Sequence, residues 1–413
     1  MLSRRQGIAS KAGWNKIPKN FLDMNNARIR GVICMERRDF IKLCAAAAAA
    51  GTGLLGVRNF LGEEDDYTGI AADDVDELKE AYHYSGLENG EVLCGICFRE
   101  CRISDGDSGF CRIRVNNNGT LYNKVYARPS AVNVDPIEKE PMHHFYPGTD
   151  ILCVGTASCN FRCQFCHNWH LSQRDIDEVE RTYDLDPESI VAEAQNSGAP
   201  GISFTYNEPT VFYEYMYDIA RQASQEGFNV IFHTNGSMRE EPLLELLKYV
   251  DGVTVDLKAF TDDFYRDVIK AEKEPVLDTL KTIESEGVWL EIVNLVLPDY
   301  NDDPDNIADM SAWVVDELNE DVPLHFSRFT PSYQMTDLSP TPVDTLERCR
   351  EVALDQGVNH VTIGNVPGHE ANSTFCPGCG EEIISRHHFT VHDINLTDGS
   401  CEYCGREIAG VWK

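Results

Sequence analysis

The chain has 413 residues, with 36 Lys and Arg against 68 Asp and Glu, so its net charge is -32. Its length allows one large domain with smaller satellites, or two ordinary domains, and it excludes a small disulfide scaffold. A surface this acidic repels nucleic acid, so we expect no nucleic-acid partner. Dense carboxylates stay hydrated in concentrated salt, which indicates a halophilic source and carries no catalytic meaning.

The first 62 residues combine a basic extension with the pattern of an export signal. Residues 1–34 contain seven Lys or Arg and one acid, so Met35 is a candidate for the true start. Arg37 and Arg38 are followed by an apolar run over 44–57, which is typical of a twin-arginine signal. The run is shorter than the roughly 20 residues that span a bilayer. We expect an exported or membrane-attached protein, with a cytoplasmic protein as the alternative.

The next segments are an acidic linker with a short helix over 63–92 and a Cys-rich module over 93–150. Beyond them, apolar runs rich in β-branched residues alternate with helical periodicity, which predicts a chain of βα units. A helix is expected between Asp186, its N-cap, and Gly198, its stop. The strands are expected at 151–157, 202–206, 230–233, 253–257, 290–297, 324–329 and 361–363.

Strands that are apolar almost throughout indicate a parallel sheet covered on both faces. Such a sheet is either doubly wound or curved into a barrel. No G-x-G-x-x-G motif follows the first strand, which disfavours a dinucleotide-binding sheet. The predicted fold class is therefore α/β, with the sheet over 151–368 and a separate C-terminal module over 369–413.

Fifteen cysteines occur in the chain, and eleven of them form three clusters whose short gaps suit metal better than disulfides. Cys159, Cys163 and Cys166 follow the first strand of the sheet. A structural zinc ion wants four protein ligands, and only three are local here, although a distant fourth is compatible with the sequence. A [4Fe–4S] cluster held by three thiolates instead leaves one iron free to bind a small molecule through N and O donors.

The spacing C-x3-C-x2-C, with Phe165 before the last cysteine, resembles the signature of the radical S-adenosylmethionine (SAM) superfamily. The resemblance implies a partial TIM-type (β/α) barrel in which the free iron binds SAM through its amino and carboxylate groups. One electron then breaks a carbon–sulfur bond of SAM, and the resulting 5′-deoxyadenosyl radical abstracts hydrogen from a substrate. A low-potential electron donor is implied as well.

Polar side chains follow the predicted strands at the edge where such barrels have their sites. Glu208 stands where the superfamily has Gly-Gly-Glu, whose Glu meets the SAM amino group, although Tyr206 and Asn207 replace the glycines. Asp256 and Lys258 resemble the Asp-Leu-Lys of pyruvate formate-lyase activating enzymes. Any of these side chains could instead be a satisfied polar group at the barrel mouth. We expect the cofactor to contact Phe165, Asn207, Glu208, Asn235 and Asp256, and we expect catalytic roles for Lys258, His325 and Arg328.

Two further cysteine sets flank the barrel. After it, two C-x-x-C pairs separated by 21 residues form a zinc-ribbon pattern, so zinc is the expected metal at Cys376, Cys379, Cys401 and Cys404. Before it stands a less regular quartet, which could hold structural zinc or an auxiliary iron–sulfur cluster. We favour a structural ion at this quartet, made of Cys94, Cys97, Cys101 and Cys111.

From residue 94 to residue 412 the chain resembles the AmmeMemoRadiSam radical SAM family, which is related to pyruvate formate-lyase activating enzymes. The resemblance rests on the three cysteine sets and on 135–141, 147–148, 363–368 and 410–412. It implies Memo-like and AMMECR-type proteins as partners and leaves the substrate open between a protein and a small molecule. The competing hypothesis is a non-catalytic iron–sulfur electron carrier, or an interaction protein whose fold is stabilised by bound metal ions. A carrier, however, should use four cysteines per cluster and needs no barrel.

Overall fold

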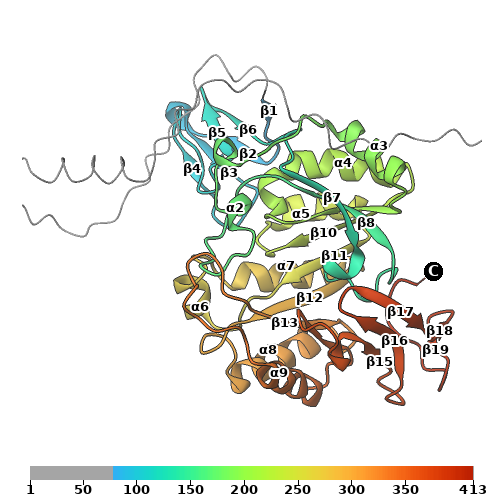
Figure 1. Ribbon diagram of the computed structural model, residues 1–413. Coiled ribbons are helices and arrows are strands. Elements are labelled where there is room, and N and C mark those ends of the chain that lie inside the picture. Colours follow the sequence, from blue (N-terminus) through green and yellow to red (C-terminus); the bar gives the residue numbers. More distant parts are fainter. Residues whose placement is uncertain (1–77, 413) are drawn as a thin grey trace, which may run out of the picture. The chain divides into compact units, whose positions relative to one another are not determined.

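The computed structural model describes residues 78–412 (Figure 1). The expected basic extension, the twin-arginine segment and most of the acidic linker lie outside the described residues. Within 78–412, the helices are all too short or too polar to cross a bilayer.

An eight-stranded sheet forms the centre of the fold, in the order β14-β13-β12-β11-β10-β9-β8-β7. Strands β8 to β14 run parallel, and β7 (Ala131–Pro136) pairs antiparallel with β8 at one edge. The two edge strands do not pair with each other, so the sheet is an open, partial barrel. The parallel strands are β8 (Asp150–Gly155), β9 (Gly201–Phe204), β10 (Asn229–Thr234), β11 (Gly252–Asp256), β12 (Trp289–Val296), β13 (Leu324–Arg328) and β14 (Val361–Gly364).

Helices connect successive parallel strands, as a right-handed βα array requires. The helix α3 (Pro187–Ser197) has the expected ends, because the Asp186 side chain accepts a hydrogen bond from the Ser189 N–H and Gly198 adopts a left-handed conformation. The apolar faces of the helices pack on the sheet and build one large core. The other helices are α2 (Trp169–Ser172), α4 (Tyr213–Gln225), α5 (Glu240–Leu246), α6 (Asp262–Asp267), α7 (Glu274–Ser285), α8 (Pro304–Glu317) and α9 (Val343–Asp355).

The N-terminal module consists of two small three-stranded sheets, ordered β1-β6-β5 and β2-β3-β4. Its strands are β1 (Lys79–Glu80), β2 (Tyr84–Gly86), β3 (Val92–Cys94), β4 (Arg102–Ile103), β5 (Arg114–Asn117) and β6 (Thr120–Asn123). The helix expected before residue 93 is therefore wrong where the structure describes it, since β1 pairs with β6 there. The expected boundary at 150 also shifts, because β7 belongs to the central sheet.

The C-terminal module has one three-stranded sheet, β15-β16-β17, and one hairpin, β18-β19. Its strands are β15 (Thr374–Phe375), β16 (Glu382–His387), β17 (Thr390–Ile394), β18 (Leu396–Thr397) and β19 (Ser400–Cys401). Buried Arg386 of β16 donates to the His143 carbonyl at 2.6 Å. The chain end also pairs with the barrel, since Val411 exchanges backbone hydrogen bonds with His144 and Tyr146. Both contacts fix this module against the segment that precedes β8.

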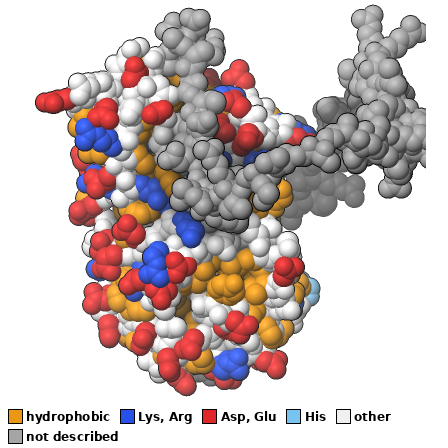
Figure 2. Space-filling model, turned by 90° about the vertical axis from the view of Figure 1, so that its left-hand side faces the viewer, with side chains coloured by type: hydrophobic (Ala, Val, Ile, Leu, Met, Phe, Trp, Pro, Cys, Tyr) orange, Lys and Arg blue, Asp and Glu red, His pale blue; other side chains and the backbone are white. Residues whose placement is uncertain are grey.

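Acidic side chains are spread widely over the face of the molecule in Figure 2, and Lys and Arg are fewer there. The distribution agrees with the net charge of -32 for the whole chain.

Candidate active site

A cavity of about 400 Å³ opens at the carboxyl ends of the parallel strands. Its wall combines side chains that follow β8, β9, β10 and β11 with side chains of β12, β13 and β14. This is the edge at which parallel barrels place their reactive groups, because the loops that follow the strands converge there. Three thiols lie on its wall, from Cys159, Cys163 and Cys166.

The loop that carries the three thiols is held at several points by backbone hydrogen bonds. Arg162 and Gln164 donate their N–H groups to the carbonyls of Ile269 and Val268. Ser158, in a left-handed conformation with φ of 69°, donates its N–H to Leu171. These contacts come from two different βα loops, so the positions of the three sulfurs are set by tertiary structure as well as by their spacing.

The thiols are shielded from water, with Cys159 and Cys163 less than 10% exposed. Burial raises the pKa of Cys159 to about 12, and it also raises the pKa of Cys163 and Cys166. Three buried thiolates without a cation would be strongly unfavourable. The arrangement therefore suits ligands of a metal centre, whose positive charge stabilises the deprotonated form.

Asn207 fastens the start of this loop to the end of β9. Its side-chain amide contacts Thr156 Oγ1, the Ala157 carbonyl and the Ser158 carbonyl at 2.8–3.1 Å, and its Oδ1 accepts from the Thr156 N–H at 2.8 Å. At the end of β8, just before the loop begins, Gly155 leaves no room for a side chain. A Cβ atom there would lie 2.7 Å from the Thr205 carbonyl oxygen. Asn207 is thus a positioning residue for the cysteine loop and lines the cavity.

Glu208 is 4% exposed, and its carboxylate accepts four hydrogen bonds from the chain itself. The donors are the backbone N–H and hydroxyl of Thr210, the hydroxyl of Thr234 and the backbone N–H of Asn235, at 2.6–3.1 Å. A carboxylate has about four acceptor sites. The structure therefore makes Glu208 the link between the ends of β9 and β10, and an outside donor would have to share an oxygen with these groups.

Asn235 connects this link to the cysteine loop. Its Nδ2 donates to Asn160 Oδ1 at 2.9 Å and contacts Cys159 Sγ at 3.8 Å. Its Oδ1 is buried on the cavity wall and has no hydrogen-bond partner. A buried acceptor without a partner indicates a place that a ligand donor fills.

Asp256, at the end of β11, contacts the side chains of Lys258 and His233. Its carboxylate lies 2.8 Å from Lys258 Nζ and 3.3 Å from His233 Nε2, and all three side chains line the cavity. Although burial opposes the charged form, Lys258 and His233 hold the pKa of Asp256 below its usual range. Burial likewise opposes the charged forms of Lys258 and His233, yet the carboxylate raises the pKa of both.

Comparisons with known proteins identify this arrangement. A family model described as the radical SAM superfamily matches residues 154–310. An uncharacterized protein of Methanocaldococcus jannaschii is 44% identical over 333 residues, which cover 80% of this chain and 99% of that protein. The pyruvate formate-lyase 1-activating enzyme of Escherichia coli is 24% identical over 217 residues, which cover 48% of this chain and 86% of the enzyme.

The chain belongs to the radical SAM superfamily. It is a radical SAM enzyme, and the superfamily implies a [4Fe–4S] cluster and SAM. Among solved structures, a domain of a pyruvate-formate lyase-activating enzyme from Bacteroides vulgatus matches with a TM-score of 0.37 and 17% identity, covering 40% of this chain and 100% of that chain.

The radical SAM cavity fits these two groups on its own chemistry. It offers two buried thiols and one partly buried thiol, it has the volume typical of small-molecule sites, and its wall holds buried polar atoms without partners. Among the latter are Asn235 Oδ1 and His143 Nδ1. Phe165, which is 3% exposed, lies on the same wall and packs against Phe264 with ring centroids 6.0 Å apart.

His325 occupies the floor of the radical SAM cavity, but both of its ring nitrogens are engaged. Nδ1 lies 2.7 Å from Thr362 Oγ1, and Nε2 lies 2.7 Å from a carboxylate oxygen of Glu291. The ring of His143 lies beside it, with the two ring centroids 4.4 Å apart. Unlike His325, His143 has an Nδ1 atom that is buried without a hydrogen-bond partner. Burial lowers the pKa of His143 well below its usual value, so this ring is neutral at pH 7. His143 was missed by the sequence analysis.

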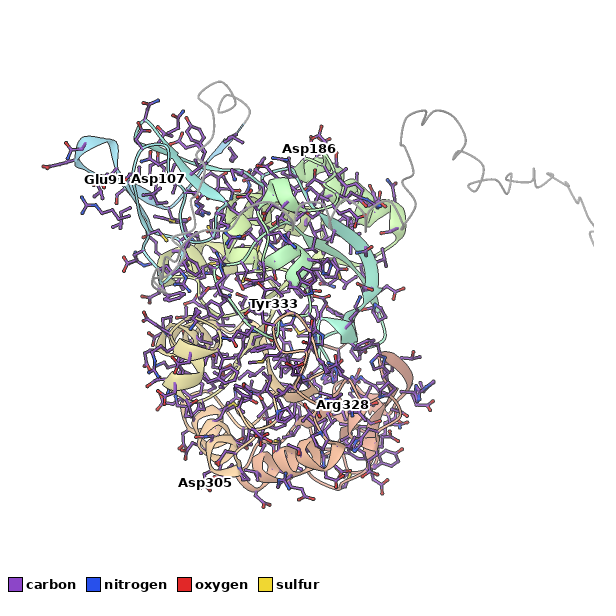
Figure 3. All side chains as sticks on the ribbon, turned by 60° about the vertical axis from the view of Figure 1, so that its left-hand side comes forward. Glu91, Asp107, Asp186, Asp305, Arg328 and Tyr333 are labelled. Carbon is purple, nitrogen blue, oxygen red and sulfur yellow. The ribbon has the colours of Figure 1, made fainter. Side chains whose placement is uncertain are left out.

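Arg328 does not line the cavity, contrary to its expected catalytic role. Its Nε donates to the Thr341 carbonyl at 2.8 Å, at the end of β13 (Figure 3). Side chains alternate along a strand, and His325 and Ser327 take the cavity face. Arg328 is one residue out of phase with them and points away.

The loop that follows β13 reaches back toward the cysteine loop. There Tyr333 (Figure 3) stacks on Trp169, with the ring centroids 5.5 Å apart.

Replacing Asp256 with Asn is expected to destabilise the protein by about 2–3 kcal/mol, between the values for exposed and fully buried ion pairs. The substitution leaves Lys258 without a counter-charge. The raised pKa of His233 adds stability that is present below pH ~6.5 and is lost as the pH rises through the folded-state value. In the variant, the unfolding free energy should no longer show this dependence on pH when it is measured by urea unfolding from pH 6 to pH 9. An unchanged pH profile would contradict the assignment.

The C-terminal quartet has the spacing of a single-ion site. The four sulfur atoms of Cys376, Cys379, Cys401 and Cys404 all lie within 4.8 Å of one another, and two pairs are 3.6 Å and 3.8 Å apart. A tetrahedral zinc ion with bonds of about 2.3 Å to sulfur sets its ligands about 3.8 Å apart. The quartet can therefore bind one metal ion.

The Cys379→Ala variant is expected to lose one zinc per chain, because three thiolates no longer enclose the ion. Its C-terminal module should become sensitive to proteolysis while the iron content stays unchanged. Metal analysis beside limited proteolysis measures both effects, and the wild-type chain is the control. Wild-type protein without zinc at this site, or loss of iron in the variant, would contradict the prediction.

Proposed function

We propose that the protein uses SAM and a [4Fe–4S] cluster to abstract a hydrogen atom from another protein. The observation that carries the proposal is the placement of three cysteine thiols, two buried and one partly buried, and several unpartnered polar atoms on one cavity at the carboxyl edge of the sheet. When bound, the two groups supply a 5′-deoxyadenosyl radical through one-electron cleavage of a carbon–sulfur bond. The electron comes from a low-potential donor.

Different residues of the chain hold the cluster and bind SAM. Cys159, Cys163 and Cys166 hold the cluster. Lys258, whose charge also favours the Cys163 thiolate, presents a cation toward the carboxylate of SAM. Asn235 Oδ1 accepts from a donor of SAM, and the Glu208 carboxylate behind it fixes the Asn235 backbone.

The barrel wall excludes water and thiols from the reactive space. His143 closes the floor of the cavity as a neutral ring, and His325 closes it as a ring with both nitrogens hydrogen-bonded. Neither offers a weak O–H or S–H bond to a radical. A substrate therefore enters from the open side of the cavity, at the carboxyl ends of the strands.

A protein substrate is supported by the names of the relatives. One is the pyruvate formate-lyase 1-activating enzyme of Escherichia coli, and another is a putative glycyl-radical enzyme activating enzyme of Methanocaldococcus jannaschii, 27% identical over 179 residues. The finer alternatives are an activase that makes a glycyl radical and a modifier of another residue. Memo-like and AMMECR-type proteins are candidate partners through the family resemblance alone.

The test measures the transfer of deuterium from a candidate substrate to 5′-deoxyadenosine. Reduced protein, SAM and candidate proteins labelled with deuterium are incubated without oxygen, and 5′-deoxyadenosine is analysed by mass spectrometry. A substrate transfers deuterium to the 5′ carbon, whereas unlabelled 5′-deoxyadenosine marks abortive cleavage. If deuterated small molecules transfer their label and no protein does, the proposed substrate class is refuted.

A further inference from the structure

A second group of four cysteines lies inside the N-terminal module. Cys94 is on β3, Cys97 and Cys101 are on the β3–β4 turn, and Cys111 precedes β5. The Cys94 N–H donates to the Cys101 carbonyl at 2.9 Å, which brings the two ends of the turn together. All four residues line one cavity, together with Ile96, Ile103 and Val211. Three of the four are buried and Cys101 is partly buried.

The spacing of this quartet differs from that of the C-terminal quartet. Within residues 78–412, Cys376 and its three partners are the only group of three or more metal-ligating side chains whose ligand atoms gather within 4.8 Å. The N-terminal sulfurs therefore stand farther apart than the ~3.8 Å edge of a zinc tetrahedron. The three thiols of the catalytic loop are also too widely spaced to form such a group.

The size of the cavity between the four thiols agrees with this wider spacing. It holds about 10 Å³ of space for the centre of a water-sized sphere. Such a sphere touches a sulfur atom no closer than about 3 Å, whereas the bond from zinc to sulfur is about 2.3 Å. A single zinc ion at this place would require the thiols to move inward.

Polar groups on the wall point to a ligand that accepts hydrogen bonds. Arg114 is 1% exposed, and its Nη2 is held by Glu214 at 2.9 Å, yet its Nε and Nη1 have no partner. The bridging sulfides of an iron–sulfur cluster accept such hydrogen bonds, while a zinc ion within four thiolates adds no acceptor of its own. Glu214 already balances the charge of Arg114, so the guanidinium contributes donors more than net charge.

The quartet also adjoins the catalytic loop. Asn160, next to Cys159, lines the quartet cavity. The Ser158 hydroxyl donates to the Cys111 carbonyl, and Arg99 Nε donates to the Asn160 carbonyl at 2.7 Å. The two cysteine sites are thus built on one hydrogen-bonded unit.

We propose that Cys94, Cys97, Cys101 and Cys111 hold a second [4Fe–4S] cluster, each thiolate binding one iron. Four cysteines complete the coordination of such a cluster and leave no iron open. The second cluster therefore does not bind SAM. This assignment replaces the structural ion favoured by the cysteine spacing alone, and it goes beyond the proposed function.

The test uses the full chain with Cys159, Cys163 and Cys166 all replaced by Ala, reconstituted with iron and sulfide without oxygen. It should contain about four iron and four sulfide per chain, and its reduced form should give an electron paramagnetic resonance signal that SAM does not change. Adding Cys97→Ala together with Cys101→Ala leaves only two of the four thiolates, so it should remove the iron and leave about one zinc. Adding Cys379→Ala instead, as the matched control, should remove the zinc and leave the iron.

The triple variant alone decides the proposal, even where the Cys97 and Cys101 variant does not fold. A triple variant with no iron and about two zinc ions per chain would show that the quartet is a structural zinc site. A reduced signal that changes on adding SAM would show an open iron and contradict four-cysteine ligation. Because this chain lacks the catalytic cysteines, neither result depends on the proposed function.

Discussion

The Cys163→Ala variant is expected to lose the catalytic cluster and all cleavage of SAM. Cys163 is 7% exposed on the cavity wall, and two thiolates cannot hold three irons of a cluster. The iron content should fall by about four per chain, with a matching loss of absorbance near ~400 nm. Iron analysis and chromatography of 5′-deoxyadenosine measure the two effects.

Cys349→Ala is the matched control, because Cys349 is equally buried but lies on α9, away from all three cysteine sets. It should keep the iron and the cleavage of SAM. Cleavage that persists in Cys163→Ala would remove this thiol from the set of cluster ligands.

The Glu214→Gln variant is expected to lose about 3–5 kcal/mol of unfolding free energy. Glu214 is 0% exposed on α4, and its carboxylate accepts from Arg114, from Asn123 Nδ2 at 2.7 Å and from the Tyr82 N–H at 2.9 Å. The amide would leave Arg114 buried without a counter-charge and would turn a donor toward other donors. Denaturant unfolding measures the loss.

Glu193→Gln, on the exposed face of α3, is the control and should change the unfolding free energy by less than about 0.5 kcal/mol. The three donors to Glu214 come from the N-terminal module, so the Glu214 variant should also make that module sensitive to proteolysis first. Equal stability of the two variants would mean that the buried pair does not anchor the module.

The seven parallel strands could be predicted because each is an apolar run long enough to cross the sheet. The first strand, β8, shows this, since its five residues after Asp150 are all buried. The small strands β1 and β2 could not be predicted in this way. They are two and three residues long, and only their pairing with β6 and β3 defines them.

The site could be predicted where residues follow the strand ends, as with Asn207, Asn235, Asp256 and Lys258. His143 lies in the connection between β7 and β8, where Glu291 of β12 accepts from its backbone N–H at 2.8 Å. The sequence could have shown that only one of His325 and Arg328 lines the cavity. His325 and Arg328 have opposite parity on one strand, so they cannot both face the cavity.

The roles of Glu208 and His325 depend on partners that no motif shows. Each is on the cavity wall as expected, but the chain already places three donors on Glu208 Oε1 and one on Oε2, and it engages both ring nitrogens of His325. Their partners come from other strands and loops, which the sheet brings together. Patterns of residues predict which side chains gather at a site, and hydrogen-bond geometry decides which of them are free to act.

The most direct measurement of the central claim is the release of 5′-deoxyadenosine. The reconstituted wild-type chain is reduced without oxygen, mixed with SAM and analysed by chromatography, with Cys163→Ala as the blank. We expect 5′-deoxyadenosine and methionine in the wild-type sample and neither in the blank. A wild-type chain that carries its full iron content, accepts the electron and releases no 5′-deoxyadenosine, with or without candidate substrate proteins, would contradict the account.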